Sequence, residues 1–491
     1  MNIIVFLICG FLISLLFPPY FLLPLGFIVF PYLCYYLENN CSSLSKSSLF
    51  ISGFCLGFSF YLSALFWLKN PFFVFEETKN FFLIFLILII LLAIIFAIVL
   101  TTILNFNKIL SITFILPLIF SINEFIVSKI LYGFPWVIFS LVISNNDILL
   151  ILIKNFGTFL TSFLIIQIFC LPYLFVRRTF IRFELTSFII ICVFPLFLIF
   201  FIHKNFLQVK NIQDKTINIE VFQMNFQNQM VDDDISKRLG KIIKSIKNSE
   251  ADVLIFAENN YPYLIKNFEF TEIKSVLREN QTLVIGGTRI ENNNAYNTLF
   301  NIQKSDISYY DKKILVPFGE FLPFRNILSF FEKISGSKDF SIGKEKRLIN
   351  INNDLNYIPV ICYEIIFYWK IINQFNYKSD FIINITNDSW FGTLIGPYQH
   401  LYLTKLRSIE FSKPIIRVSN NGISSIIDSN SNLIKATKLN EKNNLNLNLN
   451  IKKEKNFYRS HVYINRYFFI ILFFLLIINL IKTYEKRNIQ K

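Results

Sequence analysis

Residues 358–367 read Ile-Pro-Val-Ile-Cys-Tyr-Glu-Ile-Ile-Phe, an apolar run that carries a single thiol and a single carboxylate. A short apolar run bounded by polar segments is typical of a strand that is buried on both faces. We therefore predict a strand over residues 357–363, with Cys362 at its end. Functional side chains in open α/β sheets gather at such strand ends, so this stretch suggests both a fold and a site.

Similar runs recur throughout residues 204–465. We predict further strands over residues 217–226, 252–257, 282–289, 297–302, 381–386 and 415–419, and a helix over residues 233–249. The alternating Asn and Leu residues of 443–455 are equally compatible with a linker and with a late edge strand. Strands that alternate with helices over this length indicate one layered α/β domain.

The remainder of the chain is far more apolar. Of 491 residues, 54% are hydrophobic and only 16% are charged, whereas soluble domains carry about 25% charged residues. This deficit excludes disorder and indicates segments that lie in lipid. We predict eight membrane-spanning helices, at 3–17, 18–36, 49–68, 81–104, 110–128, 155–176, 187–203 and 467–481.

The predicted organisation has three parts. Residues 1–203 form a membrane domain with seven helices, residues 204–465 form an inserted α/β domain, and residues 466–491 form the eighth helix and a tail. The first run has no basic segment before it and no small-residue cleavage site, which favours a retained helix over a signal peptide.

The distribution of lysine and arginine among the short loops predicts the orientation of the chain in the membrane. With a cytoplasmic N-terminus, the inner loops carry nine basic residues and the outer loops four, which fits the positive-inside rule. Both termini are then cytoplasmic, and residues 204–465 lie on the outer face. The inner set is Lys46, Lys108, Arg177, Arg178, Arg182, Lys482, Lys486, Arg487 and Lys491, and the outer set is Lys69, Lys79, Lys129 and Lys154.

Several partners are not expected. The net charge of +15 accompanies 59 Phe and abundant Ile, Asn and Lys, a composition that AT-rich codons produce, so it does not by itself indicate nucleic acid. The cysteines are too scattered for a zinc site. No glycine-rich phosphate loop is present. We therefore expect no metal and no other cofactor.

Cys362 is the only cysteine between residues 204 and 465. Without a disulfide partner it is either a buried, inert thiol or a nucleophile. Glu258 ends the apolar run 251–258, where desolvation would raise its pKa toward that of a general base. Lys312 follows a further run and would stabilise a thiolate or an oxyanion. Each charge alone is more often an ion-pair partner or a surface group, but Glu, Lys and Cys at successive strand ends indicate a thiol active site.

These residues occur within longer motifs that resemble a known family. Residues 204–465 resemble the nitrilase or carbon-nitrogen hydrolase superfamily, and the full length is similar to the bacterial apolipoprotein N-acyltransferase family. The matching stretches are Lys312 with Leu-Val-Pro-Phe-Gly-Glu at 315–320, Ile-Cys-Tyr-Glu at 361–364, Asn-Asp-Ser-Trp-Phe-Gly at 387–392, Gly-Pro-Tyr-Gln-His at 396–400, Arg407 with Glu410, Arg417 with Asn-Asn-Gly at 420–422, and Glu124 with Gly-Phe-Pro-Trp at 133–136.

The resemblance implies a fold and a set of roles. The inserted domain would be a nitrilase-like α-β-β-α sandwich, with Glu258 as general base, Lys312 as stabiliser of the transition state and Cys362 as nucleophile. Lys312 is preferred to Lys313 because it stands eight residues before Glu320, the family spacing. Further matched positions required for activity are Glu320, Tyr363 and Glu364, which could act by holding the triad, and Asn297 fits a position in the site wall.

The resemblance also implies substrates. A phospholipid would donate an acyl chain through a thioester on Cys362, and the acceptor would be the N-terminal amine of a diacylglyceryl-modified apolipoprotein. The enzyme would act as a monomer in the bacterial inner membrane, with its catalytic domain in the periplasm. Trp390 and Phe391 would line the acyl pocket or belong to the core. After Gln223 and Asn225 the family usually has a loop Trp, which this sequence lacks.

Two other functions stay open. A membrane-tethered amidase or nitrilase-like hydrolase would use the same triad with water as the acceptor. A transporter or scaffold with an inactive enzyme domain would need a polar pathway through the membrane, yet Glu124 is the only acidic residue within the predicted spans. His400 could serve as a base beside Cys362, but a structural role beneath the Trp390 loop is favoured.

Overall fold

The computed structural model describes residues 3–40, 44–106, 111–176, 215–227, 232–332, 336, 338–351, 355–371 and 378–451. The chain divides into two compact units. The helical unit comprises Met1–Leu68, Leu83–Lys210 and Tyr458–Lys491, and the α/β unit comprises Lys69–Phe82 and Asn211–Phe457. The spans predicted at 187–203 and 467–481, and the basic residues beside them, lie outside the described residues.

The helical unit follows the apolar runs of the sequence. Its described helices are α1 (Ile3–Ser14), α2 (Gly26–Asn40), α3 (Lys46–Ala64), α4 (Phe85–Phe106), α5 (Ile112–Lys129) and α6 (Leu150–Val176). Within the described chain, four helical segments are long and apolar enough to cross a membrane, and α1 is a shorter apolar helix. A polytopic helical region is thereby confirmed, while the number eight stays a prediction.

Close packing in the helical unit uses small and aromatic residues. A Cβ atom at Gly53 of α3 would lie 3.0 Å from the Cα atom of Ala97 on α4, so these helices approach closely, as small residues permit in membranes. Phe139 packs its ring against Phe30, Phe60 and Phe120. Glu124 of α5 accepts a hydrogen bond of 2.6 Å from the Phe139 amide, which fixes α5 to the segment after the Gly-Phe-Pro-Trp motif.

The α/β unit contains two six-stranded sheets, with strand orders β12-β1-β2-β3-β4-β5 and β11-β10-β9-β8-β7-β6. β1, β2 and β3 are parallel, as are β7, β8 and β9, and the outer pairs are antiparallel. The strands are β1 (Lys215–Gln223), β2 (Val253–Phe256), β3 (Thr282–Glu291), β4 (Asn294–Ile302), β5 (Ile307–Asp311), β6 (Ile349–Ile351), β7 (Leu355–Ile361), β8 (Phe381–Thr386), β9 (Ile415–Ser419), β10 (Ser425–Ile427), β11 (Leu433–Ala436) and β12 (Asn443–Ile451).

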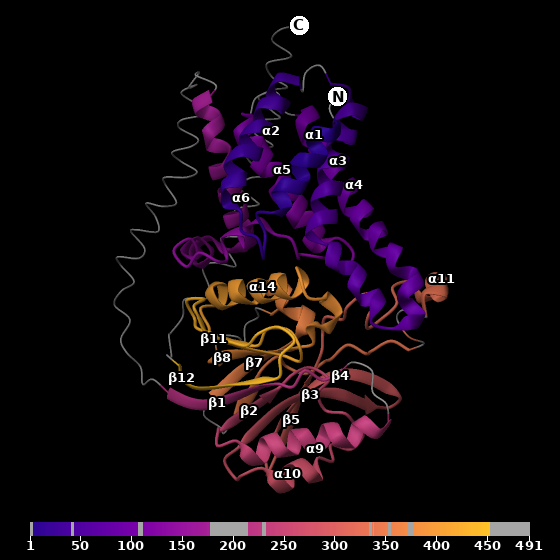
Figure 1. The fold of residues 1–491 in the computed structure, drawn as a ribbon, viewed down its shortest axis with the longest axis vertical. Helices are drawn as coiled ribbons and strands as arrows, with labels where there is room; N and C mark the ends of the chain where they lie inside the picture. The colour runs from indigo at the N-terminus through magenta and orange to yellow at the C-terminus, as the bar shows by residue number, and fades with distance from the viewer. Residues whose placement is uncertain are drawn as a thin grey trace. The chain divides into compact units, whose positions relative to one another are not determined.

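Helices cover the outer face of each sheet. The helices α9 (Asp232–Asn248) and α10 (Thr271–Val276) lie against the first sheet, and α14 (Gly396–Phe411) lies against the second (Figure 1). Leu239, Ile242 and Ile246 recur at helical spacing on α9 and join the buried core with side chains of the first sheet, as expected of an amphipathic helix on a sheet. The α/β unit is thus an α-β-β-α sandwich, which confirms the predicted fold class. The shorter helices are α11 (Arg325–Leu328) and α13 (Tyr368–Ile371).

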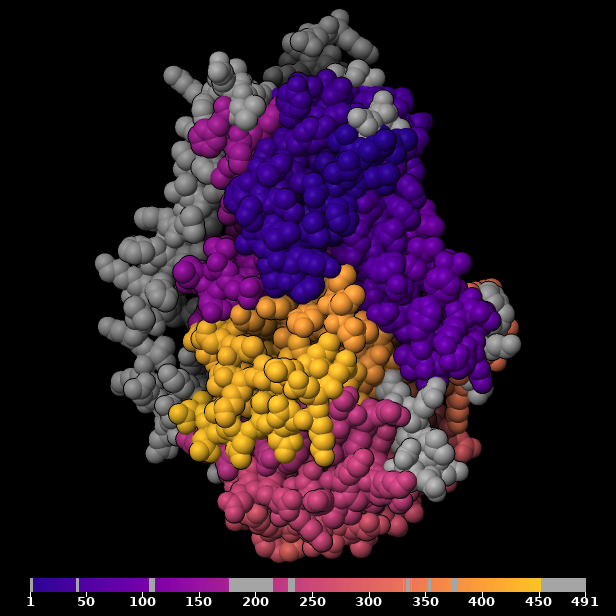
Figure 2. Space-filling view, in the orientation of Figure 1, coloured from indigo at the N-terminus to yellow at the C-terminus, as the bar shows by residue number. Residues whose placement is uncertain are grey.

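All seven predicted strands are present, and β8 and β9 have the predicted bounds. Residues 443–451 form the edge strand β12, which pairs with β1 over its whole length. The sequence did not predict β5, β6, β10 and β11, which have at most five residues each. β11 is exposed throughout and belongs to the yellow surface in Figure 2, so no burial pattern marks it in the sequence.

The sandwich brings the carboxyl ends of several strands together. Ala257 and Glu258 turn sharply past the end of β2, and Gly286 of β3 packs directly against this turn. The amide of Gly286 donates a hydrogen bond of 3.2 Å to the Ala257 carbonyl. A Cβ atom at Gly286 would lie 2.6 Å from the Cα atom of Glu258 and 2.8 Å from the Asn259 nitrogen. The position of Glu258 therefore depends on a glycine in the neighbouring strand.

Replacing Gly286 with Ala should lower the free energy of unfolding of the α/β unit by roughly 1–3 kcal/mol, the usual cost of forcing a methyl group into a packed interior. The matched control is Gly240→Ala in α9, where a Cβ atom meets nothing within 4 Å and should stabilise the helix by about 0.5–1 kcal/mol. Thermal unfolding of the full-length protein measures both. A melting temperature of Gly286→Ala equal to that of the wild type would contradict this account.

Candidate active site

Glu258, Lys312 and Cys362 meet inside the α/β unit. Glu258 follows β2, Lys312 follows β5 directly and Cys362 follows β7 directly, so two of these residues come from the first sheet and one from the second. Their exposed fractions are 5%, 1% and 6%. The three residues singled out from the sequence therefore form one buried cluster.

Glu258 is the centre of this cluster. Its Oε1 atom accepts hydrogen bonds from Asn297 Nδ2 at 2.8 Å and Lys312 Nζ at 3.4 Å, and its Oε2 atom accepts one from the Asn387 amide at 2.9 Å. The thiol of Cys362 is hydrogen-bonded to the same carboxylate. Burial raises the pKa of Glu258, and the charge of Lys312 offsets only part of this rise. Glu258 is therefore a carboxylate that readily takes up a proton, placed beside a thiol.

Lys312 is held between two carboxylates. Its Nζ atom lies 2.8 Å from Glu320 Oε1 in addition to its contact with Glu258. Burial alone would lower the pKa of Lys312, but the charges of Glu320 and Glu258 outweigh it and raise the pKa well above its usual value. The lysine is therefore a permanent cation. The neighbouring Lys313 is half-buried and does not reach this cluster; its amide donates to Glu364.

Glu320 and Asn297 complete the cluster. Asn297 Nδ2 donates to Glu320 Oε1 at 2.7 Å as well as to Glu258, and Glu320 Oε2 accepts from the Val316 amide at 2.8 Å. The main-chain carbonyl oxygen of Asn297 also accepts a hydrogen bond of 2.8 Å from the Lys312 amide. Both residues predicted from the sequence therefore orient the lysine and the glutamate by direct contact.

Cys362 has an unusual backbone. Its φ angle is +48°, in the left-handed region that costs a non-glycine residue roughly 1 kcal/mol or more. Burial, followed by the charge of Glu258, raises the pKa of the Cys362 thiol, while the charge of Lys312 and the nearby Thr386 hydroxyl act in the opposite sense. At rest the sulfur thus keeps its proton, and it becomes a nucleophile only when that proton is transferred.

Glu364 lies behind the cluster and is fully buried. Its carboxylate accepts hydrogen bonds from the Ile361 amide at 3.0 Å, beside Cys362, and from the Lys313 amide at 2.9 Å, beside Lys312. Tyr310 Oη and both terminal nitrogens of Arg347 donate to it as well. Burial would raise the pKa of Glu364, but Arg347 and these donors lower it below its usual value. Tyr363 is buried and packs on Phe367, with their ring centroids 5.0 Å apart.

Trp390 and Phe391 lie beside the cluster without touching the three central residues in any described contact. Phe391 packs against the His400 ring at 5.3 Å between centroids, and Trp390 packs against Phe75 at 5.9 Å. Asn70 Nδ2 donates a hydrogen bond of 3.0 Å to the Phe391 carbonyl. The segment Lys69–Phe82, which precedes α4, therefore braces the loop that carries Trp390.

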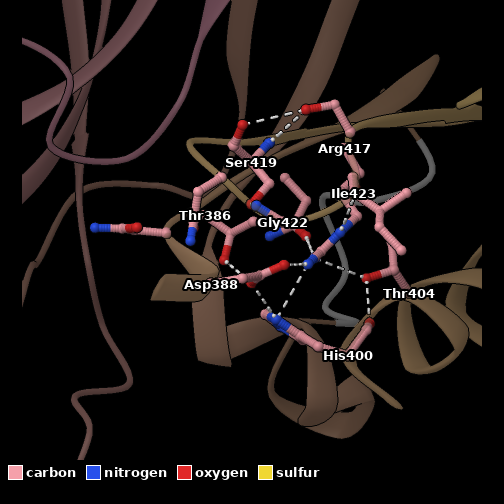
Figure 3. Close-up of polar contacts among 12 residues, drawn as sticks. Thr386, Asp388, His400, Thr404, Arg417, Ser419, Gly422 and Ile423 are labelled. Atoms are coloured by element: carbon pink, nitrogen blue, oxygen red, sulfur yellow. Dashed lines mark hydrogen bonds and ion pairs between the residues drawn. The ribbon is translucent and has the colours of Figure 1, made fainter. Parts of the chain in front are cut away.

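Two sets of contacts were not predicted from the sequence. Arg347, the buried partner of Glu364, lies in an irregular segment with no periodic pattern. Asp388 forms a buried cluster with His400 and Arg417 (Figure 3). All three belong to motifs quoted above, and the signal that could have found the ion pair is the presence of two opposite charges inside otherwise apolar segments. His400 contacts Asp388 and the Cys362 main chain, which agrees with a structural role.

The described residues contain no group of three or more His, Cys, Asp or Glu side chains that could hold a metal ion. A protonated thiol, a basic carboxylate and a fixed ammonium group suit attack on a carbonyl carbon followed by stabilisation of an oxyanion.

Comparison with known proteins places the α/β unit in a class. The family model described as Carbon-nitrogen hydrolase matches residues 221–451, and the one described as Apolipoprotein N-acyltransferase N-terminal domain matches residues 9–171. The α/β unit is thus a carbon-nitrogen hydrolase domain, carried by a chain with apolar helices long enough to span a membrane.

Proteins that match most of the chain identify the family within this class. The apolipoprotein N-acyltransferase of Wigglesworthia glossinidia brevipalpis is 31% identical over 425 residues, covering 81% of this chain and 82% of its own. That of Rickettsia prowazekii (strain Madrid E) is 28% identical over 457 residues, 90% of each chain. This chain therefore belongs to the apolipoprotein N-acyltransferase family.

A solved structure gives a weaker likeness. XC1258 from Xanthomonas campestris, a CN-hydrolase superfamily protein, is 14% identical with a TM-score of 0.37, covering 48% of this chain and 91% of its own.

The environment of Glu364 predicts an acid-sensitive fold. Because its folded pKa lies below the usual value of 4.5, its contribution to stability is present above pH 4.5 and is lost as the pH falls toward the folded pKa. Glu364→Gln leaves the Arg347 charge buried, so at pH 7 it should lower the free energy of unfolding by about 3–5 kcal/mol. Thermal unfolding should show this gap from the wild type narrowing at pH 4.

The matched control is Glu279→Gln, because Glu279 is 77% exposed and pairs with Lys304 at the surface. This variant should unfold like the wild type at both pH values. If Glu364→Gln does the same, the carboxylate does not hold the site together.

Proposed function

We propose that this chain transfers an acyl chain from a phospholipid, through a thioester on Cys362, to the N-terminal amine of diacylglyceryl-cysteine in apolipoproteins. This reaction is the last step of lipoprotein maturation. The observation that carries the proposal is the buried cluster of Cys362, Glu258 and Lys312 in a chain whose helical part matches the N-terminal domain of this family.

In the first half-reaction, Glu258 takes the thiol proton and Cys362 Sγ attacks the ester carbonyl of the phospholipid. The carbonyl oxygen becomes an oxyanion that Lys312 stabilises. The bond between the carbonyl carbon and the glycerol oxygen then breaks, and Glu258 returns the proton to that oxygen. A thioester and a lysophospholipid result. The hydrogen bond between thiol and carboxylate supports this proton transfer.

In the second half-reaction, the amine of the lipoprotein cysteine attacks the thioester carbonyl. Glu258 takes a proton from the attacking nitrogen, the bond between carbon and sulfur breaks, and the proton returns to Sγ. The product is an amide, and the thiol is restored. A thioester prefers an amine to water where the site excludes water, and the small exposed fractions of the three residues support such a site.

The helical unit would hold the site at the membrane, where both substrates keep their acyl chains. The proposed location is the inner membrane, with cytoplasmic termini, eight spans and a periplasmic catalytic domain over residues 204–465, acting as a monomer. Trp390 and Phe391 would contribute to the acyl pocket. A membrane-tethered amidase is the alternative, and the match of residues 9–171 to the N-acyltransferase model favours the transferase.

Incubating the purified protein with phospholipid alone should add the mass of one acyl chain to the peptide that contains Cys362. Adding a diacylglyceryl-cysteine peptide should then remove the adduct and yield an N-acylated peptide, whereas an amidase would release free fatty acid. Mass spectrometry of protein and products reads both steps. Absence of the adduct under turnover conditions would overturn the mechanism.

Two pairs of variants serve as controls. Cys362→Ser should abolish the adduct, whereas Cys55→Ser, which alters a cysteine of α3, should retain it. Lys312→Met should slow adduct formation by about 100-fold or more, the usual cost of losing an oxyanion-stabilising group. Lys313→Met, at the adjacent lysine, should stay within about threefold of the wild type because that side chain does not reach the cluster.

The orientation has its own test. A reporter fused after Lys491 should be active only in its cytoplasmic form, and one inserted in the exposed strand β11 only in its periplasmic form, because lysine and arginine favour the inner loops. The opposite pair of results would reverse the proposed topology without affecting the chemistry.

A further inference from the structure

A second cluster of polar side chains lies beside Cys362. The described contacts connect this cluster to Cys362 and not to Lys312. Asp388 is fully buried, and its Oδ1 atom accepts hydrogen bonds from Thr386 Oγ1 at 3.0 Å and from His400 Nδ1 at 2.9 Å. Its Oδ2 atom accepts one from Arg417 Nη2 at 2.5 Å. Figure 3 shows Asp388 between these three partners. Because an ionised carboxylate can only accept, the Thr386 hydroxyl hydrogen points at Asp388.

The cluster around Asp388 is rigid. Arg417 is fully buried and donates to Asn384 Oδ1 at 3.0 Å, to Thr404 Oγ1 at 3.2 Å and to the Ile423 carbonyl at 3.3 Å. A Cβ atom at Gly422 would lie 2.0 Å from Asp388 Oδ2, so the glycine lets the chain close over the carboxylate. This cluster leaves no room for a substrate. It can influence the reaction only through the residues that it contacts.

Thr386 connects this cluster to the nucleophile. β7 and β8 are parallel, and Ile361 pairs with Ile385, so Cys362, which follows β7 directly, comes beside Thr386, the last residue of β8. The Thr386 hydroxyl lies close enough to the Cys362 sulfur to lower the pKa of its thiol, and Thr386 is fully buried. The hydroxyl therefore contacts both a permanent anion and the reacting atom.

A hydroxyl group has one hydrogen and cannot donate to both partners at once. At rest the thiol holds its own proton, and the threonine hydrogen lies on Asp388. Once Glu258 has taken the thiol proton, the sulfur is a buried anion that needs a donor, since an unpaired buried charge is costly. Asp388 can release the threonine hydrogen at that moment because His400 and Arg417 still donate to it.

We propose that Thr386 is a further catalytic residue, whose hydroxyl turns from Asp388 to the Cys362 sulfur when the thiolate forms. Asp388, His400 and Arg417 are positioning residues that hold the hydroxyl ready. No covalent bond changes in this step; one hydrogen bond is exchanged for another. The inference rests on the proposed function in one respect, that Cys362 is the nucleophile.

The test compares Thr386→Val, which keeps the shape of the side chain without its hydroxyl, with Thr386→Ser, which keeps the hydroxyl without its methyl group. The probe is iodoacetamide, which reacts with thiolates, and peptide mass spectrometry measures its rate at Cys362 in the full-length protein. Thr386→Val should react about tenfold more slowly than the wild type, the effect of losing a hydrogen bond to a charged group. Thr386→Ser should stay within about threefold.

The matched control is Thr282→Val, which removes another buried hydroxyl at the opposite, amino end of a strand, and it should react like the wild type. Equal rates in Thr386→Val and the wild type would overturn the proposal. So would equal losses in the Val and Ser variants, which would indicate packing alone. If Thr386→Val does not fold, Thr386→Ala and Thr386→Ser differ only by the hydroxyl oxygen and carry the same expectation.

Alkylation requires neither phospholipid nor lipoprotein. A wild type that alkylates at Cys362 but forms no acyl adduct would refute the proposed function and leave the role of Thr386 to be decided by the rates alone.

Discussion

The carboxylate of Glu364 fixes the geometry on which the site depends. Lys312 follows a strand of the first sheet and Cys362 follows a strand of the second, and two sheets in apolar contact can slide against each other at little cost. Glu364 accepts the amide hydrogens of Lys313 and Ile361, one beside each of these residues. Hydrogen bonds are directional where apolar contact is not, so Glu364 fixes the spacing of cation and thiol through the main chain, while Glu258 contacts both side chains directly.

Such a bridge requires a compensating charge. A buried carboxylate is stable only if its charge is paired and its oxygens are hydrogen-bonded, and Arg347 supplies the charge. Asp388 and Arg417 form a second buried ion pair of this kind on the other side of Cys362. The nucleophile is thus placed between two neutralised ion pairs, and the strained backbone of Cys362 is held from both sides.

Much of the fold follows from local patterns in the sequence. Continuous apolar runs are enough to locate β2, β7 and β8, and the polar residues that end two of those runs are Glu258 and Cys362. Arg347 could not be found in the same way because it lies in an irregular stretch, and only the three-dimensional structure reveals its partner. The brace from Asn70 to Phe391 joins residues 321 positions apart. No periodicity within either segment encodes a contact at that distance along the chain.

That contact has a consequence for how the protein is made. Lys69–Phe82 leaves the ribosome early, between two apolar helices, but its partners around Trp390 are synthesised only after β1–β8. The α/β unit is therefore discontinuous in the chain. Its first segment is synthesised together with the membrane helices, before the strands that complete the unit. Biogenesis of the enzyme therefore requires Lys69–Phe82 to dock onto the rest of the α/β unit, in addition to insertion of the helices into the membrane. The loop around Trp390 reaches its final form only when both steps are complete.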